Sequence, residues 1–259
     1  MAQRSSYKQG TPCWTDLMTT DVAGAKAFYG RLFGWTFDDM PIPMGGVYSM
    51  ALVDSDTVAA IAPQPPMVAA TKAPAAWSTY LAVDSVDDAV SAVDANGGSV
   101  LMPASDVPEA GRMAFIADPT GAVVGLWQAS GHIGATRVNE PNTLVWNELT
   151  TSDVPAALPF YKAVASIDAA PMQMGDMEYT MLKVDGDDVG GATIPQMDGV
   201  PNHWHTWFAV SDAAATASAV TAAGGTIVAG PMDIPVGTAV TIRDPQGAVF
   251  SVLQPAEQS

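Results

Sequence analysis

Trp14-Thr15-Asp16-Leu17 returns 132 residues later as Trp146-Asn147-Glu148-Leu149, and this repeated stretch decides how the chain is organised. The other repeated landmarks follow in the same order, at intervals that drift from 132 to 126 residues: Asp21-Val22 with Asp153-Val154, Phe28-Tyr29 with Phe160-Tyr161, Trp77 with Trp204, Gly97-Gly98 with Gly224-Gly225, and Asp118-Pro119-Thr120-Gly121 with Asp244-Pro245-Gln246-Gly247. A constant order with small drifts indicates a duplicated domain in which loops have been shortened.

Each half reads as a strand, a helix and further strands, and then as the same pattern again. In the first half, Asp21 is a suitable N-cap, the apolar residues from Val22 to Leu32 recur at helical spacing, and Gly34 can end the helix. The pattern predicts an α+β fold of four βαβββ units. We expect one domain at residues 8–129, a linker at 130–141 and a second domain at 142–256, with residues 63–74 as a proline-rich linker inside the first half.

The stretch 201–210 holds two of the three histidines of the chain. Its alternating character predicts a strand, and side chains two residues apart on a strand share a face. His203, His205 and Trp207 then line one face, with Trp204 and Phe208 on the other. We expect this strand to form a wall of any functional site.

The composition limits the class of protein and of partner. With 48% hydrophobic residues the chain can form a packed core, and its net charge of −17 argues against nucleic-acid and anionic-membrane partners. No apolar run is long enough for a membrane-spanning helix. The single cysteine, Cys13, excludes an internal disulfide and fits a reducing compartment.

The first ten residues are polar and lack the apolar core of a signal peptide. We expect them to form a short mobile tail on a cytoplasmic protein, with export without a signal peptide as the alternative. The expected partner is a small molecule, bound by a monomer or a homodimer.

The helix pattern from Asp21 and Val22 through Phe28-Tyr29 to Leu32-Phe33-Gly34-Trp35 resembles the first helix of vicinal oxygen chelate proteins. This superfamily includes glyoxalase I, bleomycin-resistance proteins and extradiol dioxygenases. The two Asp-Pro-x-Gly turns resemble the last hairpin of that fold, and the resemblance covers nearly the whole chain. It is strongest to the two-domain actinobacterial glyoxalase-like branch that includes a mycobacterial culture-filtrate antigen. The resemblance implies tandem domains whose sheets curl around clefts.

The same resemblance assigns four strand positions in each domain to metal ligands. In the first half these positions hold Trp14, Ala60, Ser78 and Gly125, and in the second half Trp146, Gly191, His205 and Ser251. Because a catalytic divalent metal normally takes at least three protein ligands, we expect no metal cofactor, with a weak divalent site at His205 and Glu148 as the alternative.

We expect the second-half cleft to carry the function. Glu148 lies two residues after Trp146 and so faces the same side. Glu148 and His205 are the predicted catalytic pair, with the two residues meeting across the cleft and His203 adding a further nitrogen. Because an unperturbed histidine titrates between about pH 5 and 8, we expect His205 to make ligand affinity pH-dependent there.

The predicted ligand-binding residues of the two clefts are Trp146, Tyr179, Trp207, His203, Trp14, Asp16, Tyr48 and Tyr80. For Asp16 a structural partner such as Arg112 is the alternative to a ligand contact. Met172, Met174, Met177 and Met181 are either binding wall or core. His132 is expected to be a solvated loop residue.

Three functions remain open. The first, which the resemblance implies, is a lyase or isomerase that detoxifies small dicarbonyls or their thiol adducts. The second is a binding protein that sequesters an aromatic or antibiotic molecule. The third is a metal-free enzyme of secondary metabolism with His205 and Glu148 as acid and base. Extradiol dioxygenase activity is disfavoured, because its iron needs two histidines and a carboxylate.

Overall fold

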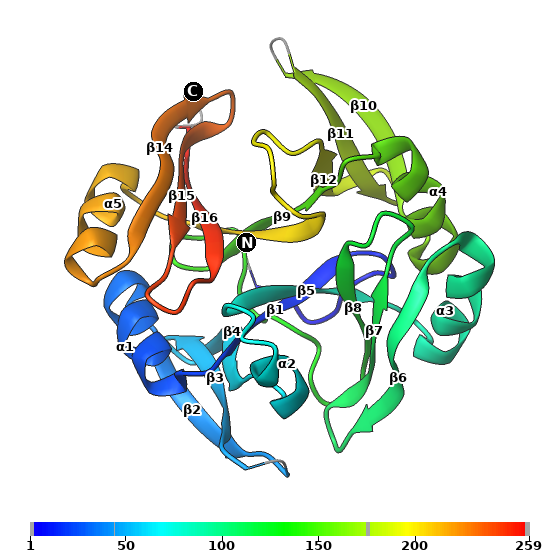
Figure 1. The fold of residues 1–259 in the computed structure, drawn as a ribbon, viewed down its shortest axis with the longest axis horizontal. Helices are drawn as coiled ribbons and strands as arrows, with labels where there is room; N and C mark the ends of the chain where they lie inside the picture. Colours follow the sequence, from blue (N-terminus) through cyan, green and yellow to red (C-terminus); the bar gives the residue numbers. More distant parts are fainter. Residues whose placement is uncertain (1–2, 44, 175–176, 257–259) are drawn as a thin grey trace.

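The computed structural model describes residues 3–43, 45–174 and 177–256, which form two eight-stranded sheets (Figure 1). The strands of the first sheet are β1 (Pro12–Thr19), β2 (Thr36–Pro41), β3 (Val47–Val53), β4 (Asp56–Pro63), β5 (Ala76–Ala82), β6 (Ser99–Val107), β7 (Gly111–Ala117) and β8 (Val123–Ala129). Those of the second are β9 (Leu144–Thr150), β10 (Asp168–Met174), β11 (Met177–Val184), β12 (Asp187–Thr193), β13 (His203–Ala209), β14 (Thr226–Ile234), β15 (Gly237–Arg243) and β16 (Val249–Pro255). The helices are α1 (Val22–Phe33), α2 (Pro66–Ala70), α3 (Val86–Val93), α4 (Val154–Ala165) and α5 (Ala213–Ala222).

Both sheets have the same strand order, which confirms the predicted duplication. The order is β2-β3-β4-β1-β5-β8-β7-β6 in the first sheet and β10-β11-β12-β9-β13-β16-β15-β14 in the second. In each sheet the two central strands are antiparallel, and each of them also pairs in parallel with the last strand of its own βαβββ unit. The four predicted units are therefore present, and the α+β prediction is confirmed.

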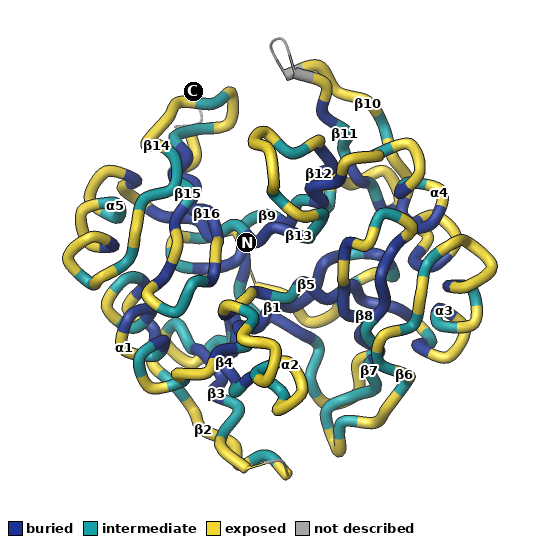
Figure 2. The backbone as a smooth tube through the Cα atoms, viewed as in Figure 1, coloured by how far each residue is buried: buried dark blue, intermediate teal, exposed yellow. Residues whose placement is uncertain are grey.

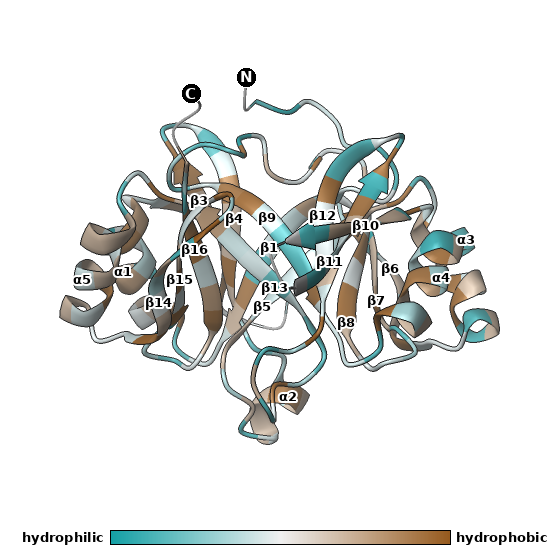
Figure 3. Ribbon diagram, turned by 90° about the horizontal axis from the view of Figure 1, so that it is seen from above, coloured by the Kyte–Doolittle hydropathy of each residue, from teal (hydrophilic) through white to brown (hydrophobic). Residues whose placement is uncertain are grey.

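The apolar cores join units from different halves. One cluster combines α1 and the first unit with α5 and the last unit, through residues such as Phe33, Phe208 and Phe250. A second cluster combines α3 with α4, through residues such as Val86, Leu126 and Phe160. Accordingly, α1 and α5 lie together on one flank of the molecule and α3 and α4 on the other (Figures 1 and 3). The buried segments, in dark blue, run along the central strands of the molecule, whereas the helices and hairpin ends are largely exposed (Figure 2).

The repeated Phe-Tyr, Trp and Asp-Pro-x-Gly landmarks meet in one hydrogen-bonded chain that also crosses between halves. Trp77 Nε1 donates to the Tyr29 hydroxyl (3.0 Å), which donates to Asp244 in the closing turn of the other half (3.0 Å). The second copy is equivalent: Trp204 Nε1 donates to the Tyr161 hydroxyl (2.8 Å), which donates to Asp118 (3.0 Å). The other oxygen of each aspartate accepts backbone N–H groups of its own turn.

The central strands of the two sheets also contact each other through polar side chains. Thr15 Oγ1 lies 3.2 Å from Thr206 Oγ1, and the hydroxyl of Thr79 donates to Asn147 Oδ1 (2.8 Å). Because Thr15 is equivalent to Asn147 and Thr79 to Thr206, these two contacts are related by the same internal repeat. The bounds predicted for the two domains stay a prediction, since each half depends on the other for its core.

Two segments expected to be loose are packed. The Tyr7 hydroxyl donates to the carbonyl of Ala135 (2.6 Å), and the amide of Ala135 donates to the carbonyl of Cys13 (2.8 Å). The expectation of a mobile tail at residues 1–10 is therefore wrong for residues 3–10; residues 1–2 lie outside the described part. Within the linker at 130–141, Ala135 and Val138 belong to an apolar cluster of the first half.

The remaining differences are minor. The proline-rich segment 63–74 contains the short helix α2, which projects away from both termini (Figure 3). The N-cap prediction is confirmed, because the Asp21 carboxylate accepts the Gly24 amide (2.9 Å). Within the described residues, no helix combines the length and the hydropathy needed to cross a membrane.

Candidate functional site

The inner face of the second sheet, meaning the face turned away from α4 and α5, carries the predicted site residues. Leu149, Trp204 and Phe208 belong to the helix-side cores, so the alternating positions on β9 and β13 point the other way. Glu148 is the register partner of His205 on the neighbouring antiparallel strand. The two residues are therefore side by side on the floor of the curled sheet. The expectation that they meet across the cleft is wrong.

Glu148 is held by a chain of two hydrogen bonds from the aromatic residues Tyr179 and Trp146. Trp146 Nε1 donates to the Tyr179 hydroxyl (2.9 Å), which donates to Glu148 Oε2 (2.9 Å). Gly191 makes this possible, because a Cβ atom at that position would lie only 1.8 Å from the Tyr179 hydroxyl. Burial raises the pKa of Glu148 to about 7, and the Tyr179 hydrogen bond offsets only part of that rise.

His205 is engaged through both ring nitrogens. Its Nε2 lies 2.8 Å from Ser251 Oγ, and its Nδ1 lies 3.4 Å from His203 Nε2. Burial lowers the pKa of His205 to about 3, and the neighbouring His203 lowers it further. The expectation that His205 titrates between pH 5 and 8 is therefore wrong; the group on this floor that titrates near neutrality is Glu148.

Trp207 supplies a hydrogen-bond donor that no described residue uses. Its ring is partly exposed and packs edge-on near His205, with ring centroids 5.7 Å apart. The indole Nε1–H is buried and has no hydrogen-bond partner among the described residues. Leaving such a group unpaired costs about 1–3 kcal/mol, so a ligand oxygen here would relieve a real penalty.

The inner face of the first sheet repeats this arrangement with Asp16 in place of Glu148, but here the carboxylic acid is fully buried. Trp14 Nε1 donates to the Tyr48 hydroxyl (2.9 Å), and both Tyr48 (3.2 Å) and Tyr80 (2.9 Å) donate to Asp16 Oδ2. Tyr80 occupies the position equivalent to Trp207, so the acid of the first half has one donor more than Glu148. Burial raises the pKa of Asp16 to about 6. Arg112, suggested as its partner, instead pairs with Asp87 and Asp106 on the surface.

The first inner face is also filled by apolar side chains. Trp14 and Tyr80 are only 4% and 3% exposed and belong to a cluster with Met50 and Trp127. His132 packs edge-on against Trp14, with ring centroids 4.6 Å apart, so the expectation of a solvated loop residue is wrong. Burial lowers its pKa to about 4. The corresponding aromatic residues of the second half, Trp146 and Trp207, are partly exposed.

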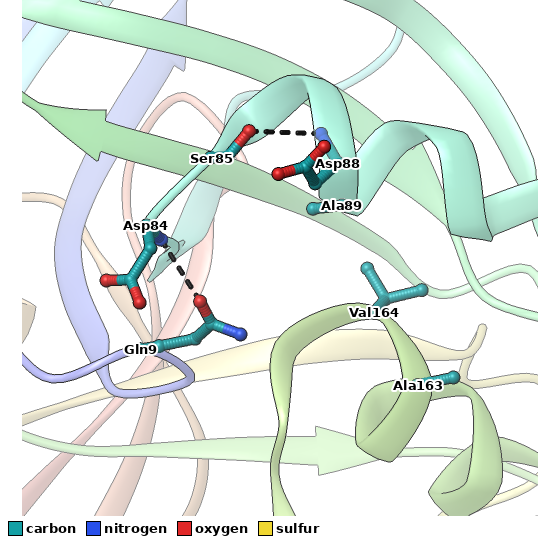
Figure 4. Close-up of a pocket in the computed structure, with 7 residues that line it drawn as sticks. All are labelled: Gln9, Asp84, Ser85, Asp88, Ala89, Ala163 and Val164. Atoms are coloured by element: carbon teal, nitrogen blue, oxygen red, sulfur yellow. Dashed lines mark hydrogen bonds between the residues drawn. The ribbon is translucent and has the colours of Figure 1, made fainter.

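Two surface cavities of the described residues lie away from this floor. One of about 320 Å³ lies between α3 and α4 and is lined by Gln9, Asp84, Ser85, Asp88, Ala89, Ala163 and Val164 (Figure 4). The other, of about 90 Å³, lies near the start of β9 and includes Arg4 and Trp146 in its lining. Neither includes Glu148 or His205, so the site is defined by its polar groups and not by these cavities.

The donor set of the second inner face does not fit a divalent metal. Of the four positions implied for metal ligands, Trp146 and Gly191 have no side-chain atom that binds a metal. At the other two positions, His205 Nε2 and Ser251 Oγ are hydrogen-bonded to each other. In the described ranges, no three His, Cys, Asp or Glu side chains come together as a metal site. A weak metal at His205 and Glu148 therefore lacks a third protein ligand.

Sequence reasoning missed the roles of Gly191, Ser251 and Thr241. Ser251 was considered only as a failed ligand, and Thr241, whose Oγ1 lies 3.0 Å from Ser251 Oγ, was not considered. Of the methionine group, Met172 is exposed, and the side chains of Met174 and Met177 lie outside the described part.

Comparisons with known proteins agree with this architecture. The profile of the Glyoxalase/Bleomycin resistance protein/Dioxygenase superfamily matches residues 13–126 and 142–252. The chain is 56% identical to "Putative glyoxylase CFP32" of Mycobacterium bovis over 261 residues, covering 100% of both chains. It is 34% identical to "Anthracycline biosynthesis protein DnrV" of Streptomyces peucetius, covering 96% of this chain and 94% of that one.

Solved structures support the fold alone, because their sequence identity is low. The 2,3-dioxygenase LapB from Pseudomonas superposes with a TM-score of 0.66 at 15% identity, covering 98% of this chain and 95% of that one. The Mn(II)-bound glyoxalase from Novosphingobium aromaticivorans gives 0.64 at 15% identity, covering 96% and 83%. With its two matched segments and its full-length relatives, the chain belongs to the Glyoxalase/Bleomycin resistance protein/Dioxygenase superfamily.

Proposed function

We propose that the inner face of the second sheet binds a small, uncharged carbonyl compound and that Glu148 moves a proton at the carbon next to the carbonyl. The observation that carries the proposal is a carboxyl group whose pKa burial raises to about 7 on a partly exposed, aromatic-walled floor. A general base is most effective when its pKa lies near the working pH. Isomerisation of a dicarbonyl or of its thiol adduct is one reaction of this class, in keeping with the name of the mycobacterial relative.

The polar groups of the site favour a neutral ligand oxygen. Trp207 Nε1–H is a buried donor without a hydrogen-bond partner among the described residues. No lysine or arginine belongs to the hydrogen-bonded groups of this floor, which are Trp146, Glu148, Tyr179, His203, His205, Thr241 and Ser251. A carboxylate or phosphate ligand would therefore be desolvated without a countercharge, whereas a ketone oxygen accepts a hydrogen bond from Trp207 Nε1–H and leaves the Glu148 carboxylate free to act on the neighbouring carbon.

In the proposed step, the ionised Glu148 carboxylate removes a proton from the carbon beside the carbonyl. The electron pair of that C–H bond moves onto the carbonyl oxygen, and the Trp207 N–H stabilises the negative charge that develops there. Glu148, now protonated, returns the proton to carbon. Tyr179 holds the carboxyl group in place through its hydroxyl.

A matched pair of probes tests this proposal. 2-Tetralone is an uncharged aromatic ketone with acidic protons next to its carbonyl, and tetralin has the same rings without the carbonyl. In deuterated buffer, NMR should show protein-dependent deuterium exchange into 2-tetralone, reduced at least tenfold by Glu148→Gln and unaffected by Glu178→Gln on the exposed surface of β11. Titration calorimetry should show 2-tetralone binding more tightly than tetralin. Unchanged exchange in Glu148→Gln would refute the proton-transfer role.

A second candidate function, sequestration of an aromatic molecule, is favoured by the apolar side chains exposed at the open end of the second sheet. Met172, Ile194, Met197, Met232 and Val236 are each between 47% and 57% exposed. They lie on β10, on the loop after β12 and on the β14–β15 hairpin, which surround that end in Figure 1. The name of the Streptomyces relative supports the choice of an aromatic probe. Binding of 2-tetralone without any proton exchange would favour this function over catalysis.

A further inference from the structure

Four side chains on the second inner face form a continuous hydrogen-bonded chain that ends on a backbone carbonyl. His203 Nδ1 lies 2.8 Å from the carbonyl oxygen of Pro201, and His203 Nε2 lies 3.4 Å from His205 Nδ1. His205 Nε2 lies 2.8 Å from Ser251 Oγ, which lies 3.0 Å from Thr241 Oγ1.

The carbonyl fixes the direction of every bond in this chain. A carbonyl oxygen only accepts, so His203 Nδ1 must carry the proton and donate it. Burial lowers the pKa of both histidines, so each ring is uncharged near neutrality and has one N–H. His203 Nε2 must then accept from His205 Nδ1–H, which leaves His205 Nε2 to accept from the Ser251 hydroxyl. Ser251 in turn accepts from Thr241.

A chain with this direction holds protons in place and does not conduct them. Conduction would require the Pro201 carbonyl to take up a proton and release another, which a peptide carbonyl near neutrality does not do. The groups that face His205 are Glu148 from β9, His203 from its own strand and Ser251 from β16. Among the described residues, Tyr179 from β11 is the one titratable group that is hydrogen-bonded to Glu148. Of these, Glu148 alone is outside the chain and has an oxygen without a described donor.

We infer that His203 and Ser251 are positioning residues that lock His205 as the uncharged Nδ1–H tautomer, so that Glu148 is the group on this floor that exchanges protons with a ligand. The functional part of this inference rests on the proposed function. The tautomer is a property of the free protein, so the two ideas can fail separately.

The first test is a nitrogen-15 NMR spectrum of the full-length protein with labelled histidine and without ligand. The chain has only three histidines, so the ring signals can be assigned with His132→Gln and His203→Gln. We expect His205 to show a protonated Nδ1 and an unprotonated Nε2, unchanged from pH 5 to 8. A protonated Nε2, or a charged ring anywhere in that range, would overturn the inference.

A matched pair of variants at His203, which is partly exposed at the start of β13, provides the second test. His203→Gln keeps an acceptor for His205 Nδ1–H, whereas His203→Leu removes it. We expect His203→Gln to keep the wild-type tautomer, and His203→Leu to switch His205 to Nε2–H, donating to Ser251. An unchanged tautomer in His203→Leu would refute the role of His203.

The proton-exchange assay with 2-tetralone separates the two proposals. If the tautomer is as inferred but the ketone shows neither exchange nor binding, the proposed function fails and the lock stands. If exchange depends on Glu148 but His205 carries its proton on Nε2, the lock fails and the proposed function stands.

Discussion

Replacing Glu148 by Gln should stabilise the protein, and increasingly so as the pH rises. Burial raises the pKa of this carboxyl group from 4.5 to about 7. Between these two values the folded protein retains a proton that the unfolded chain has released. Stability therefore falls as the pH rises through this window and levels off above about pH 7. Gln has nearly the same shape and can still accept the Tyr179 hydroxyl, but it carries no charge to desolvate.

The size of the effect follows from the width of that window. One pKa unit is worth about 1.36 kcal/mol, so the full penalty is about 3 kcal/mol. Because Glu148 is partly exposed, solvent screening reduces it, and we expect a gain of about 1–3 kcal/mol for Glu148→Gln at pH 8. At pH 5 most of the penalty is absent, and the gain should be less than about 1 kcal/mol.

Urea denaturation followed by tryptophan fluorescence at pH 5 and pH 8 measures this difference. Glu178→Gln is the matched control, since Glu178 is an exposed residue adjacent to Tyr179 on β11, and it should change the free energy of unfolding by less than about 0.5 kcal/mol at both values. If Glu148→Gln were as stable as the wild type at pH 8, or less stable, the buried Glu148 carboxylate would carry no desolvation penalty.

Three further outcomes follow from the structure. Burial raises the pKa of Asp16 from 3.8 to about 6. Asp16→Asn should therefore raise the free energy of unfolding by about 1–2 kcal/mol above pH 6 but change it little at pH 4. An equal effect at both pH values in urea denaturation would contradict this. Tyr161→Phe and Tyr29→Phe each remove a buried hydroxyl that accepts a Trp N–H and donates to an Asp, and should each cost about 1–3 kcal/mol in the same assay, whereas a loss in only one would argue against equivalent roles. Because no three metal-binding side chains come together among the residues that the structure describes, dialysis against a chelator should leave the affinity for 2-tetralone unchanged in calorimetry. A tenfold loss of affinity that one metal restores would contradict this.

Much of the fold was predictable because duplication leaves the same landmarks twice. The Trp, Phe-Tyr and Asp-Pro-x-Gly landmarks marked the four units, and the structure shows that these residues bond to one another across the halves. The predicted βαβββ pattern requires the strands β2 and β6, but their residue ranges were not predicted. β2 is largely exposed and carries Asp38-Asp39. The burial of β6 does alternate, but its sequence does not show this, because Leu101 and Pro103 occupy exposed positions.

The candidate site was predictable as a set of residues but not as a set of bonds. Period-two alternation placed His203, His205 and Trp207 on one face, which the pairing with β9 confirms. The register that sets His205 beside Glu148 depends on tertiary pairing, and the Tyr179 bond depends on the space left by Gly191. Neither has a local sequence pattern.

The errors have a common physical cause. His132 and the first residues were judged as loops by composition, and loops carry no periodicity that reports packing. In the structure both segments close over the first sheet, where His132 loses solvent and Tyr7 bonds to Ala135. The pH behaviour of His205 was misjudged for a related reason, since burial by distant strands determines it.

The titration of the Glu148 carboxyl group tests the central claim most directly. The chain contains five glutamates, so carbon-13 labelling of glutamate gives few side-chain carboxyl signals, and Glu148→Gln identifies the one that belongs to residue 148. This signal should titrate with a midpoint near pH 7 in the free protein. A midpoint near 4.5, the ordinary value for the residue, would contradict it and remove the basis for proton transfer at this site.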